Sequence, residues 1–129
     1  MFVDTDVLIW YMRGNEKAKS ALKNLDGFSI SVVTYIELIK GLRNKEELNL
    51  LRNSLKGWNA DIIYINEEIS TKAMFLVEQY YLSHSIQLAD ALIGATAVIY
   101  GLPLMTSNTK HYKKIKNIII KKFHHKENY

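Results

Sequence analysis

Two carboxylates lie close together near the start of the chain, at Asp4 and Asp6. Phe2 and Val3 before them are bulky and apolar, as in a buried strand, and an apolar run that can form a helix resumes at Val7. In open α/β sheets, ligands bind beyond the carboxyl ends of the strands, so a strand that ends here delivers acid to that edge. Two carboxylates at such an edge indicate a metal site. The alternative interpretation is that Asp6 caps the helix and Asp4 is a turn residue.

Two other carboxylates interrupt apolar segments of the chain. Glu37 lies within residues 35–39, and Asp90 lies within residues 88–93. An ionised carboxylate in a core costs several kcal/mol unless a cation or hydrogen bonds compensate it. Each residue also has a purely structural interpretation. Thr34 and Glu37 have the form of a capping box, and Asp90 can interact favourably with the positive end of a helix dipole.

Strand-like and helix-like segments alternate along the chain. Beyond Phe2 and Val3, strands are predicted at residues 28–33, 61–65, 102–106 and 117–120. Helices are predicted at residues 7–12, 15–25, 35–42, 46–55, 66–82, 88–100 and 109–115. This alternation predicts one α/β domain over residues 1–129, with a mainly parallel sheet covered by helices on both faces.

This arrangement is expected to bring three acids to one place. Asp4 ends the first strand, Glu37 follows the second strand, and Asp90 lies near the start of the helix that leads to the fourth. If these strands are neighbours, the three positions share one edge of the sheet. Clustered carboxylates repel one another unless a cation is present, and oxygen ligands without cysteine suit Mg²⁺ or Mn²⁺ rather than zinc. Such a site fits hydrolysis of a phosphodiester by a metal-activated water.

Polar residues also follow the fourth predicted strand, at what should be the same edge. Asn108 is a candidate cap for the helix that begins at Thr109, and its amide can still orient a metal-bound water. The histidines lack the spacing of metal ligands around the acids, so we interpret them as surface or phosphate-contacting residues. They are His84, His111, His124 and His125.

Positive charge is concentrated in the last fifth of the chain, although the net formal charge is only +4. A lysine cluster favours a polyanionic substrate, while solvated surface lysines are the alternative. Lys110, Lys113 and Lys114 are the candidate RNA contacts. The other lysines of the cluster are Lys116, Lys121, Lys122 and Lys126.

Four segments of this sequence resemble the motifs of PIN-domain proteins, and among those the VapC toxins of bacterial and archaeal toxin–antitoxin pairs. They are residues 3–9 (VDTDVLI), 31–41 (SVVTYIELIKG), 89–95 (ADALIGA) and 106–112 (TSNTKHY). Each motif alone is weakly specific. The resemblance is specific because all four occur in the family's order, in a chain of the family's length.

The resemblance implies a three-layer α/β/α fold with a five-stranded sheet in the strand order 3-2-1-4-5. It implies an endoribonuclease that depends on Mg²⁺ or Mn²⁺, with transfer or ribosomal RNA as the target class and inhibition of translation as the result. Asp4 and Asp90 are then the expected metal ligands, and Glu37 completes the acidic set. Asn108 stands where many PIN nucleases have Asp, which weakens the case for a second fully ligated metal.

Three positions beside the acids are assigned supporting roles, namely Thr5, Asp6 and Thr106. The resemblance further implies a homodimer and a cognate antitoxin whose extended tail lies across the acidic cleft. A strand-like segment occupies the place of a signal peptide, and the longest apolar run is far too short to cross a bilayer. We therefore expect a cytoplasmic protein that does not contact membranes.

Three other functions remain open at this stage. The chain could be a PIN nuclease of RNA processing without a toxin role, or a PIN-like module that binds RNA or protein without cleaving it. The Asp4-Thr-Asp6 segment also resembles haloacid-dehalogenase-type phosphatases, in which the first Asp is a nucleophile. That pattern requires Thr at the position where this chain has Leu8, and it requires a later Gly-Asp pair that the chain lacks.

Overall fold

The computed structural model describes residues 1–126, and their strands form one five-stranded sheet with the order β3-β2-β1-β4-β5. Every pair of neighbouring strands is parallel. The strands are β1 (Phe2–Val3), β2 (Phe28–Ser31), β3 (Ala60–Ile63), β4 (Leu104–Thr106) and β5 (Ile120–Lys122). The predicted α/β class and strand order are therefore confirmed.

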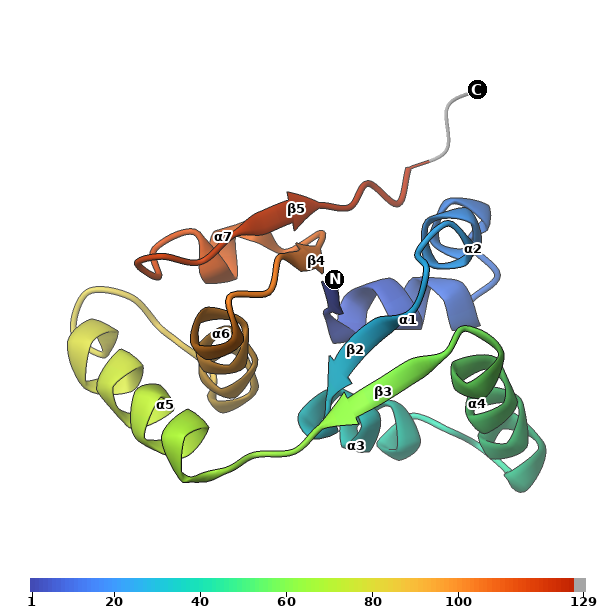
Figure 1. The fold of residues 1–129 in the computed structure, drawn as a ribbon, viewed down its shortest axis with the longest axis horizontal. Helices are drawn as coiled ribbons and strands as arrows, with labels where there is room; N and C mark the ends of the chain where they lie inside the picture. The colour runs from blue at the N-terminus through green and yellow to red at the C-terminus, as the bar shows by residue number, and fades with distance from the viewer. Residues whose placement is uncertain (127–129) are drawn as a thin grey trace.

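Seven helices in the described chain cover this sheet. They are α1 (Thr5–Met12), α2 (Glu16–Lys23), α3 (Val32–Lys40), α4 (Lys45–Gly57), α5 (Glu67–Tyr80), α6 (Leu88–Tyr100) and α7 (Thr109–Tyr112). Figure 1 shows α5 and α6 on one side of the sheet and α2 and α4 on the other. The sheet is thus the middle layer of three, as the resemblance implied.

The two central strands contribute to a separate core on each face of the sheet. Phe2 and Leu104 pack with α5 and α6, whereas Val3 and Met105 pack with the helices of the opposite face. Successive strand residues point to opposite faces, so a strand buried on both faces is apolar throughout. This burial holds the ends of β1 and β4 side by side, which is where the acids were predicted to lie.

Two helices begin at least two residues earlier than the sequence predicted, because a polar side chain caps each of them. α1 begins at Thr5 rather than Val7, since the side chain of Asp4 accepts the Thr5 N–H. α3 begins at Val32, directly after Ser31, whose side chain accepts the Val33 N–H. The β-branched pair at 32–33 was predicted as strand, but capping overrides that weak propensity. The interpretation of Asp6 as the helix cap is therefore wrong.

The predicted start of the fifth strand and end of the last helix were also wrong. β5 begins at Ile120 rather than residue 117, because Asn117 has φ of 69° and belongs to a turn. The helix predicted at 109–115 ends at Tyr112. By contrast, α6 has the predicted bounds and buries most of its middle, and Gly101 ends it in the left-handed conformation.

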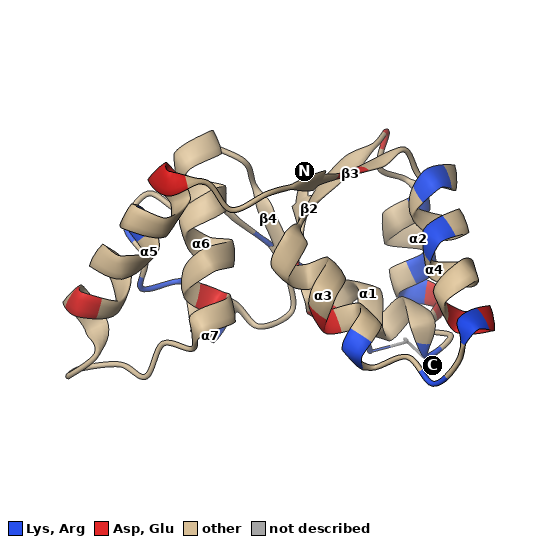
Figure 2. Cartoon of the chain, turned by 90° about the horizontal axis from the view of Figure 1, so that it is seen from below, with Lys and Arg blue, Asp and Glu red and all other residues tan. Residues whose placement is uncertain are grey.

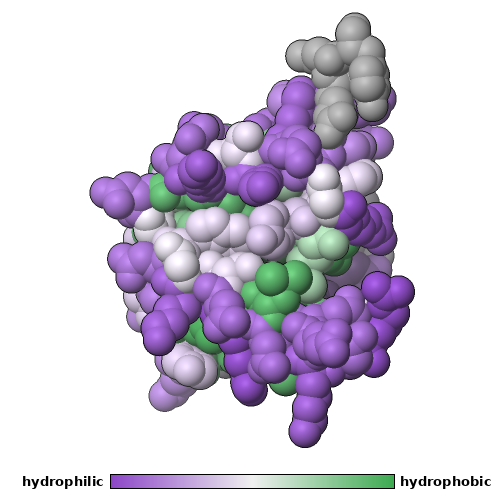
Figure 3. Space-filling view, turned by 90° about the vertical axis from the view of Figure 1, so that its right-hand side faces the viewer, coloured by the Kyte–Doolittle hydropathy of each residue, from purple (hydrophilic) through white to green (hydrophobic). Residues whose placement is uncertain are grey.

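One face of the molecule is mostly polar. Figure 3 shows one face of the molecule, on the side of α2 and α4, where hydrophilic side chains surround a small hydrophobic area. Leu50 of α4 is among the exposed apolar residues. No helix within residues 1–126 has both the length and the apolar character needed to cross a bilayer.

Candidate active site

Asp4 is a buried carboxylate at the carboxyl end of β1, with only 4% of its surface exposed. Its Oδ1 accepts the Thr5 N–H at 2.8 Å, and its Oδ2 accepts the Thr106 hydroxyl at 2.8 Å. Burial, and then the nearby charge of Asp6, raise the pKa of Asp4 from 3.8 to about 7 in spite of these hydrogen bonds. At neutral pH this carboxylate therefore favours a bound proton or a nearby cation.

Asp90 lies in the first turn of α6 and is held by two neighbours from the last helix. The Tyr112 hydroxyl donates to Asp90 Oδ1 at 3.3 Å, and Nδ1 of His111 lies 3.1 Å from Asp90 Oδ2. Tyr112 is fully buried, and its pKa is raised by burial and by the charges of both Asp4 and Asp90. Its hydroxyl therefore stays protonated as a donor, and it lies near both carboxylates.

Gly94 allows α7 to approach α6 closely enough for this contact. A Cβ atom at this position would lie 2.7 Å from the Cδ1 atom of Ile115 and 3.6 Å from Cδ1 of Tyr112. A glycine in a helix costs about 1 kcal/mol relative to alanine. Here it leaves room for the buried Ile115 side chain just after α7, and so it lets this part of the chain pack on α6, where Tyr112 lies beside Asp90.

Glu37 is an exposed carboxylate on α3 that points towards the end of β1. The Thr5 hydroxyl donates to Glu37 Oε1 at 2.8 Å and lies 2.9 Å from the hydroxyl of Thr34. The predicted capping box of Thr34 and Glu37 is therefore wrong, because Ser31 caps the helix and Thr34 is buried within it. Thr5 connects Asp4, through its N–H, with Glu37, through its hydroxyl.

Asp6 joins the start of α1 to the loop after β4. Its Oδ2 accepts the Ser107 N–H at 2.8 Å and the Ser107 hydroxyl, and Thr106 Oγ1 lies 3.5 Å away. Its Oδ1 is buried without a hydrogen-bond partner in the described chain. Asn108 precedes α7 but makes no side-chain capping bond, contrary to prediction, and its N–H donates to Thr106 Oγ1 at 3.0 Å. The loop is thus fixed by its backbone and by Asp6.

The three predicted acids are linked in pairs and do not form one metal cluster. Within residues 1–126, no group of three or more Asp, Glu or His side chains is placed to hold a metal ion. Asp4 is connected to Glu37 through Thr5, and Tyr112 lies near both Asp4 and Asp90. Mg²⁺ commonly binds one or two protein carboxylates and completes its shell with water and phosphate. The all-oxygen pair of Asp4 and Asp90 fits that chemistry, because burial raises the pKa of Asp4 and a bound cation would stabilise its ionised form.

Three residues that contact the acids were missed by the sequence analysis. Ser107, His111 and Tyr112 all lie inside the fourth motif, but nothing in their spacing shows that they contact carboxylates 21 to 101 residues away. His111 had been interpreted only as a surface or phosphate-contacting residue. Its side chain is half exposed, yet it pairs with Asp90.

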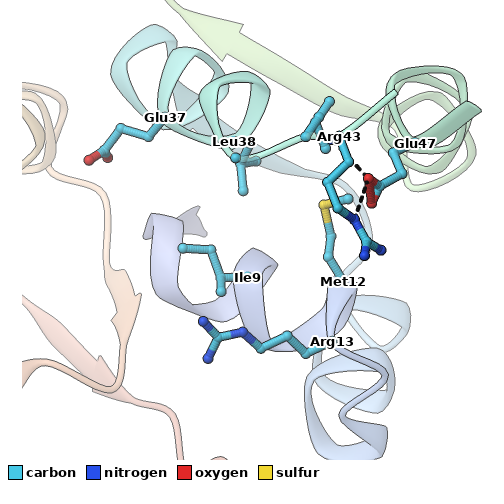
Figure 4. Close-up of a pocket in the computed structure, with 9 residues that line it drawn as sticks. Ile9, Met12, Arg13, Glu37, Leu38, Arg43 and Glu47 are labelled. Atoms are coloured by element: carbon cyan, nitrogen blue, oxygen red, sulfur yellow. Dashed lines mark hydrogen bonds and ion pairs between the residues drawn. The ribbon is translucent and has the colours of Figure 1, made fainter. Parts of the chain in front are cut away.

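A cavity of about 310 Å³ lies between α1 and α3, beside Glu37. Figure 4 shows Ile9 and Leu38 facing each other across it, with Glu37 at one end and the pair of Arg43 and Glu47 at the other. The backbone N–H and the guanidinium of Arg43 bind Glu47 at 2.9 and 3.1 Å and lower the pKa of Glu47. The cavity thus has apolar walls and charged ends.

A parallel sheet in this order, with carboxylates at the ends of its central elements, defines the class of PIN-like nucleases. The chain belongs to the PIN-domain family, whose sequence profile matches residues 1–117. This confirms the resemblance drawn from the four motifs. It also leaves the dehalogenase-type alternative without support.

Similar proteins in this family are ribonucleases. Ribonuclease VapC1 of Methanocaldococcus jannaschii is 33% identical over 125 residues, which cover 94% of this chain and 85% of that protein. Ribonuclease VapC10 of Mycobacterium tuberculosis is 35% identical over 122 residues, which cover 92% and 90%.

Similar solved structures come from toxin–antitoxin complexes. A toxin–antitoxin complex from Klebsiella pneumoniae has a chain that is 30% identical, with a TM-score of 0.72 and coverage of 92% of this chain and 94% of that one. A chain of VapBC2 from Rickettsia felis, solved with a promoter DNA fragment, has a TM-score of 0.80 and covers 95% and 98%. At 20% identity, the second structure supports the shared fold alone.

Proposed function

We propose that this protein is a ribonuclease and the toxin of a toxin–antitoxin pair, which cleaves transfer or ribosomal RNA and so inhibits translation. Two relatives named as VapC ribonucleases match it at 33% and 35% identity over nearly its whole length. The observation that carries the proposal is the buried Asp4 at the end of β1, whose pKa is raised to about 7 and which shares Tyr112 as a neighbour with Asp90. A buried carboxylate of this kind needs a cation to stay ionised.

Mg²⁺ or Mn²⁺ is the proposed cofactor, held by Asp4 and Asp90. When bound, it supplies a water of lowered pKa as nucleophile and neutralises charge on the phosphate. Tyr112 and His111 orient the carboxylate of Asp90, while Thr106 and the Thr5 N–H orient that of Asp4. These contacts fix both carboxylates before the ion and the RNA arrive.

The remaining predicted residues take roles that follow from their positions. Glu37, held by Thr5, is the carboxylate available to accept a proton from an attacking water at the edge of the site. Asn108 is exposed and presents an amide beside the loop that Asp6 fixes. Lys110 and Lys113 are exposed on and just after α7 and can attract RNA, whereas the Lys114 amine lies 3.5 Å from the Ser85 carbonyl.

The proposed partners are a second copy of the chain and a cognate antitoxin. The cavity between α1 and α3 supports the antitoxin part, because its apolar walls suit a peptide side chain and Glu37 at its end suits a basic group. A gene beside this one that encodes a small DNA-binding protein would identify the candidate antitoxin. Co-purification of the two proteins, with scattering of the toxin alone for its mass, tests both partnerships.

The catalytic proposal is tested by changing Asp4 to Asn and measuring RNA cleavage with Mg²⁺ or Mn²⁺. We expect at least a hundredfold loss of cleavage with the fold kept, because the change removes a metal-binding charge at nearly constant volume. Asp61→Asn is the matched control, since Asp61 lies on the edge strand β3 and its exposed carboxylate accepts the Ser29 hydroxyl at 2.9 Å. Folded Asp4→Asn protein that cleaves RNA at the normal rate would contradict the proposal.

A non-catalytic RNA- or protein-binding module is the second candidate. It is favoured by one observation, that no three-ligand metal group is formed within residues 1–126. It predicts that Asp4→Asn and Asp90→Asn both keep partner binding and that the wild-type protein cleaves nothing. Metal-dependent appearance of new RNA ends with the wild-type protein alone would eliminate it.

A further inference from the structure

A second cavity, of about 330 Å³, lies on the other side of the loop that follows β4. The loop contributes Ser107 and Asn108 to its wall, and the segment after β5 contributes basic side chains. Ser107 is shared between the two sites, because its N–H and hydroxyl bind Asp6 while the residue also lines the cavity. The cavity is therefore directly next to the candidate active site.

The basic wall of this cavity is tied to the sheet beside the acids. Lys122 pairs in register with Thr106, the residue whose hydroxyl donates to Asp4. The next residue, Phe123, donates its N–H to the Thr106 carbonyl at 2.8 Å and is buried. Lys122, the last residue of β5, therefore lies at the same end of the sheet as Asp4, which follows β1.

His125, two residues beyond Phe123, is held against α1 and the start of α2. The His125 ring stacks on Trp10 with centroids 4.1 Å apart and planes 7° from parallel. The Asn15 amide donates to the His125 carbonyl at 2.8 Å. Figure 1 shows this segment running from β5 towards α2. The wall is therefore preformed, which lowers the entropic cost of binding a ligand.

The charge of this wall is positive. Lys122, His124, His125 and Lys126 line it, and no Asp or Glu from the described chain does. Figure 2 shows several Lys and Arg residues on α2, which lies next to this segment in Figure 1. A volume near 330 Å³ is at the low end for small-molecule pockets, which matches a ligand of about one nucleotide.

We propose that this basic cavity binds the phosphate and nucleotide that flank the cleaved bond of a single-stranded RNA. Single-stranded RNA is recognised through its phosphates and through bases splayed from the stack, and both fit a small basic cavity with a stacked imidazole in its wall. The inference rests on the proposed function and adds that the RNA substrate is single-stranded where it binds. It assigns the main RNA contact to Lys122 and Lys126 rather than to Lys110 of α7 and Lys113 just after it.

The test compares two double variants that lose the same charge from opposite edges of the sheet. The first double variant, Lys122→Ala with Lys126→Ala, removes both lysines that line the cavity. Lys45→Ala with Lys56→Ala changes two exposed lysines of α4, which packs on the far strand β3. The probe is a short fluorescein-labelled single-stranded RNA of randomised sequence, and binding to the full chain is followed by anisotropy in a chelator at several salt concentrations.

We expect the cavity variant to bind this RNA roughly three- to tenfold more weakly, with the salt dependence of log K reduced by about 1 to 2, as for two lost phosphate contacts. The α4 variant should match the wild type. Crosslinks from 4-thiouridine RNA should map to residues 107–108 or 122–126. Equal weakening in both variants, unchanged binding in the cavity variant, or crosslinks confined to α7 would overturn the inference.

Cleavage kinetics separate this inference from the proposed function. With the wild-type nuclease active, the cavity variant should show a raised KM and a nearly unchanged kcat, because the cavity touches flanking RNA and not the cleaved bond. A wild-type protein that binds the RNA through this cavity and never cuts it would refute the proposed function and leave the cavity assignment standing. A wild-type protein that binds no RNA would overturn the inference.

Discussion

The hydroxyl of Tyr112 is a single polar atom that lies near the two proposed metal ligands. Asp4 and Asp90 are 86 positions apart by their numbers in the sequence, and the buried Tyr112 is the neighbour that they share. A ligand's hydrogen-bond partner orients it, and losing such a partner commonly costs 10- to 100-fold in metal affinity. Tyr112 is therefore expected to position Asp90 without touching substrate.

Tyr112→Phe should weaken Mn²⁺ binding by roughly tenfold and leave the fold intact, because the ring still packs against Gly94 while the donor to Asp90 is lost. Titration calorimetry of the metal measures the effect without RNA. Tyr80→Phe is the matched control, since it also loses one hydroxyl bond, at 2.6 Å to the Lys114 carbonyl, outside the site. Equal metal affinities in the two variants would rule out a positioning role for Tyr112.

The raised pKa of Asp4 predicts a pH dependence of stability for the metal-free protein. Because its pKa is about 7 in the folded chain against 3.8 for the ordinary group, the folded state binds this proton more tightly. The associated stability is complete below about pH 4 and is lost as pH rises through 7. As pH rises over this range, the free energy of unfolding of the wild type should therefore fall by a few kcal/mol relative to that of Asp4→Asn. Chemical denaturation in the presence of a chelator measures this difference. A constant difference between the two proteins would contradict the pKa assignment.

At the scale of elements, the predicted boundary between β2 and α3 was wrong because the residue that caps the helix was not identified. The pattern at residues 28–33 predicted a strand up to Val33, with Thr34 as the next helix cap. The structure ends β2 at Ser31 and uses that same residue as the cap. Alternating apolar residues predict that a strand and a helix exist, but one short polar side chain fixes the junction between them. The same shift turned Glu37 from a supposed capping residue into a partner of Thr5.

Ser31→Ala should lower the free energy of unfolding by about 1 kcal/mol, because the partly buried Val33 N–H loses its capping acceptor at 3.1 Å. Denaturant melts measure the change. Ser20→Ala on the exposed side of α2 serves as the control and should change stability by less than about 0.5 kcal/mol. If Ser31→Ala were as harmless as the control, Ser31 would not be the cap.

At the scale of the whole molecule, the sequence predicted the strand topology correctly but did not predict the side-chain contacts of the site. The alternation of apolar strands and helices predicted the parallel sheet, and the four motifs predicted the order β3-β2-β1-β4-β5. The side-chain network was not predictable, because Ser107 and Tyr112 reach Asp6 and Asp90 only after segments 101 and 22 positions apart in the sequence are packed together. Periodicity reports which face of an element is buried, and it carries no information on which polar groups meet at the end of a sheet.

The central claim is that Asp4 and Asp90 together hold a divalent ion at the carboxyl end of the sheet. The most direct test is a crystal structure of the protein soaked in Mn²⁺, with the ion located by its anomalous scattering. We predict one strong peak within bonding distance of carboxylate oxygens from both Asp4 and Asp90, which is absent in Asp4→Asn crystals. A peak bound elsewhere, or no peak at these carboxylates in saturating Mn²⁺, would contradict the account.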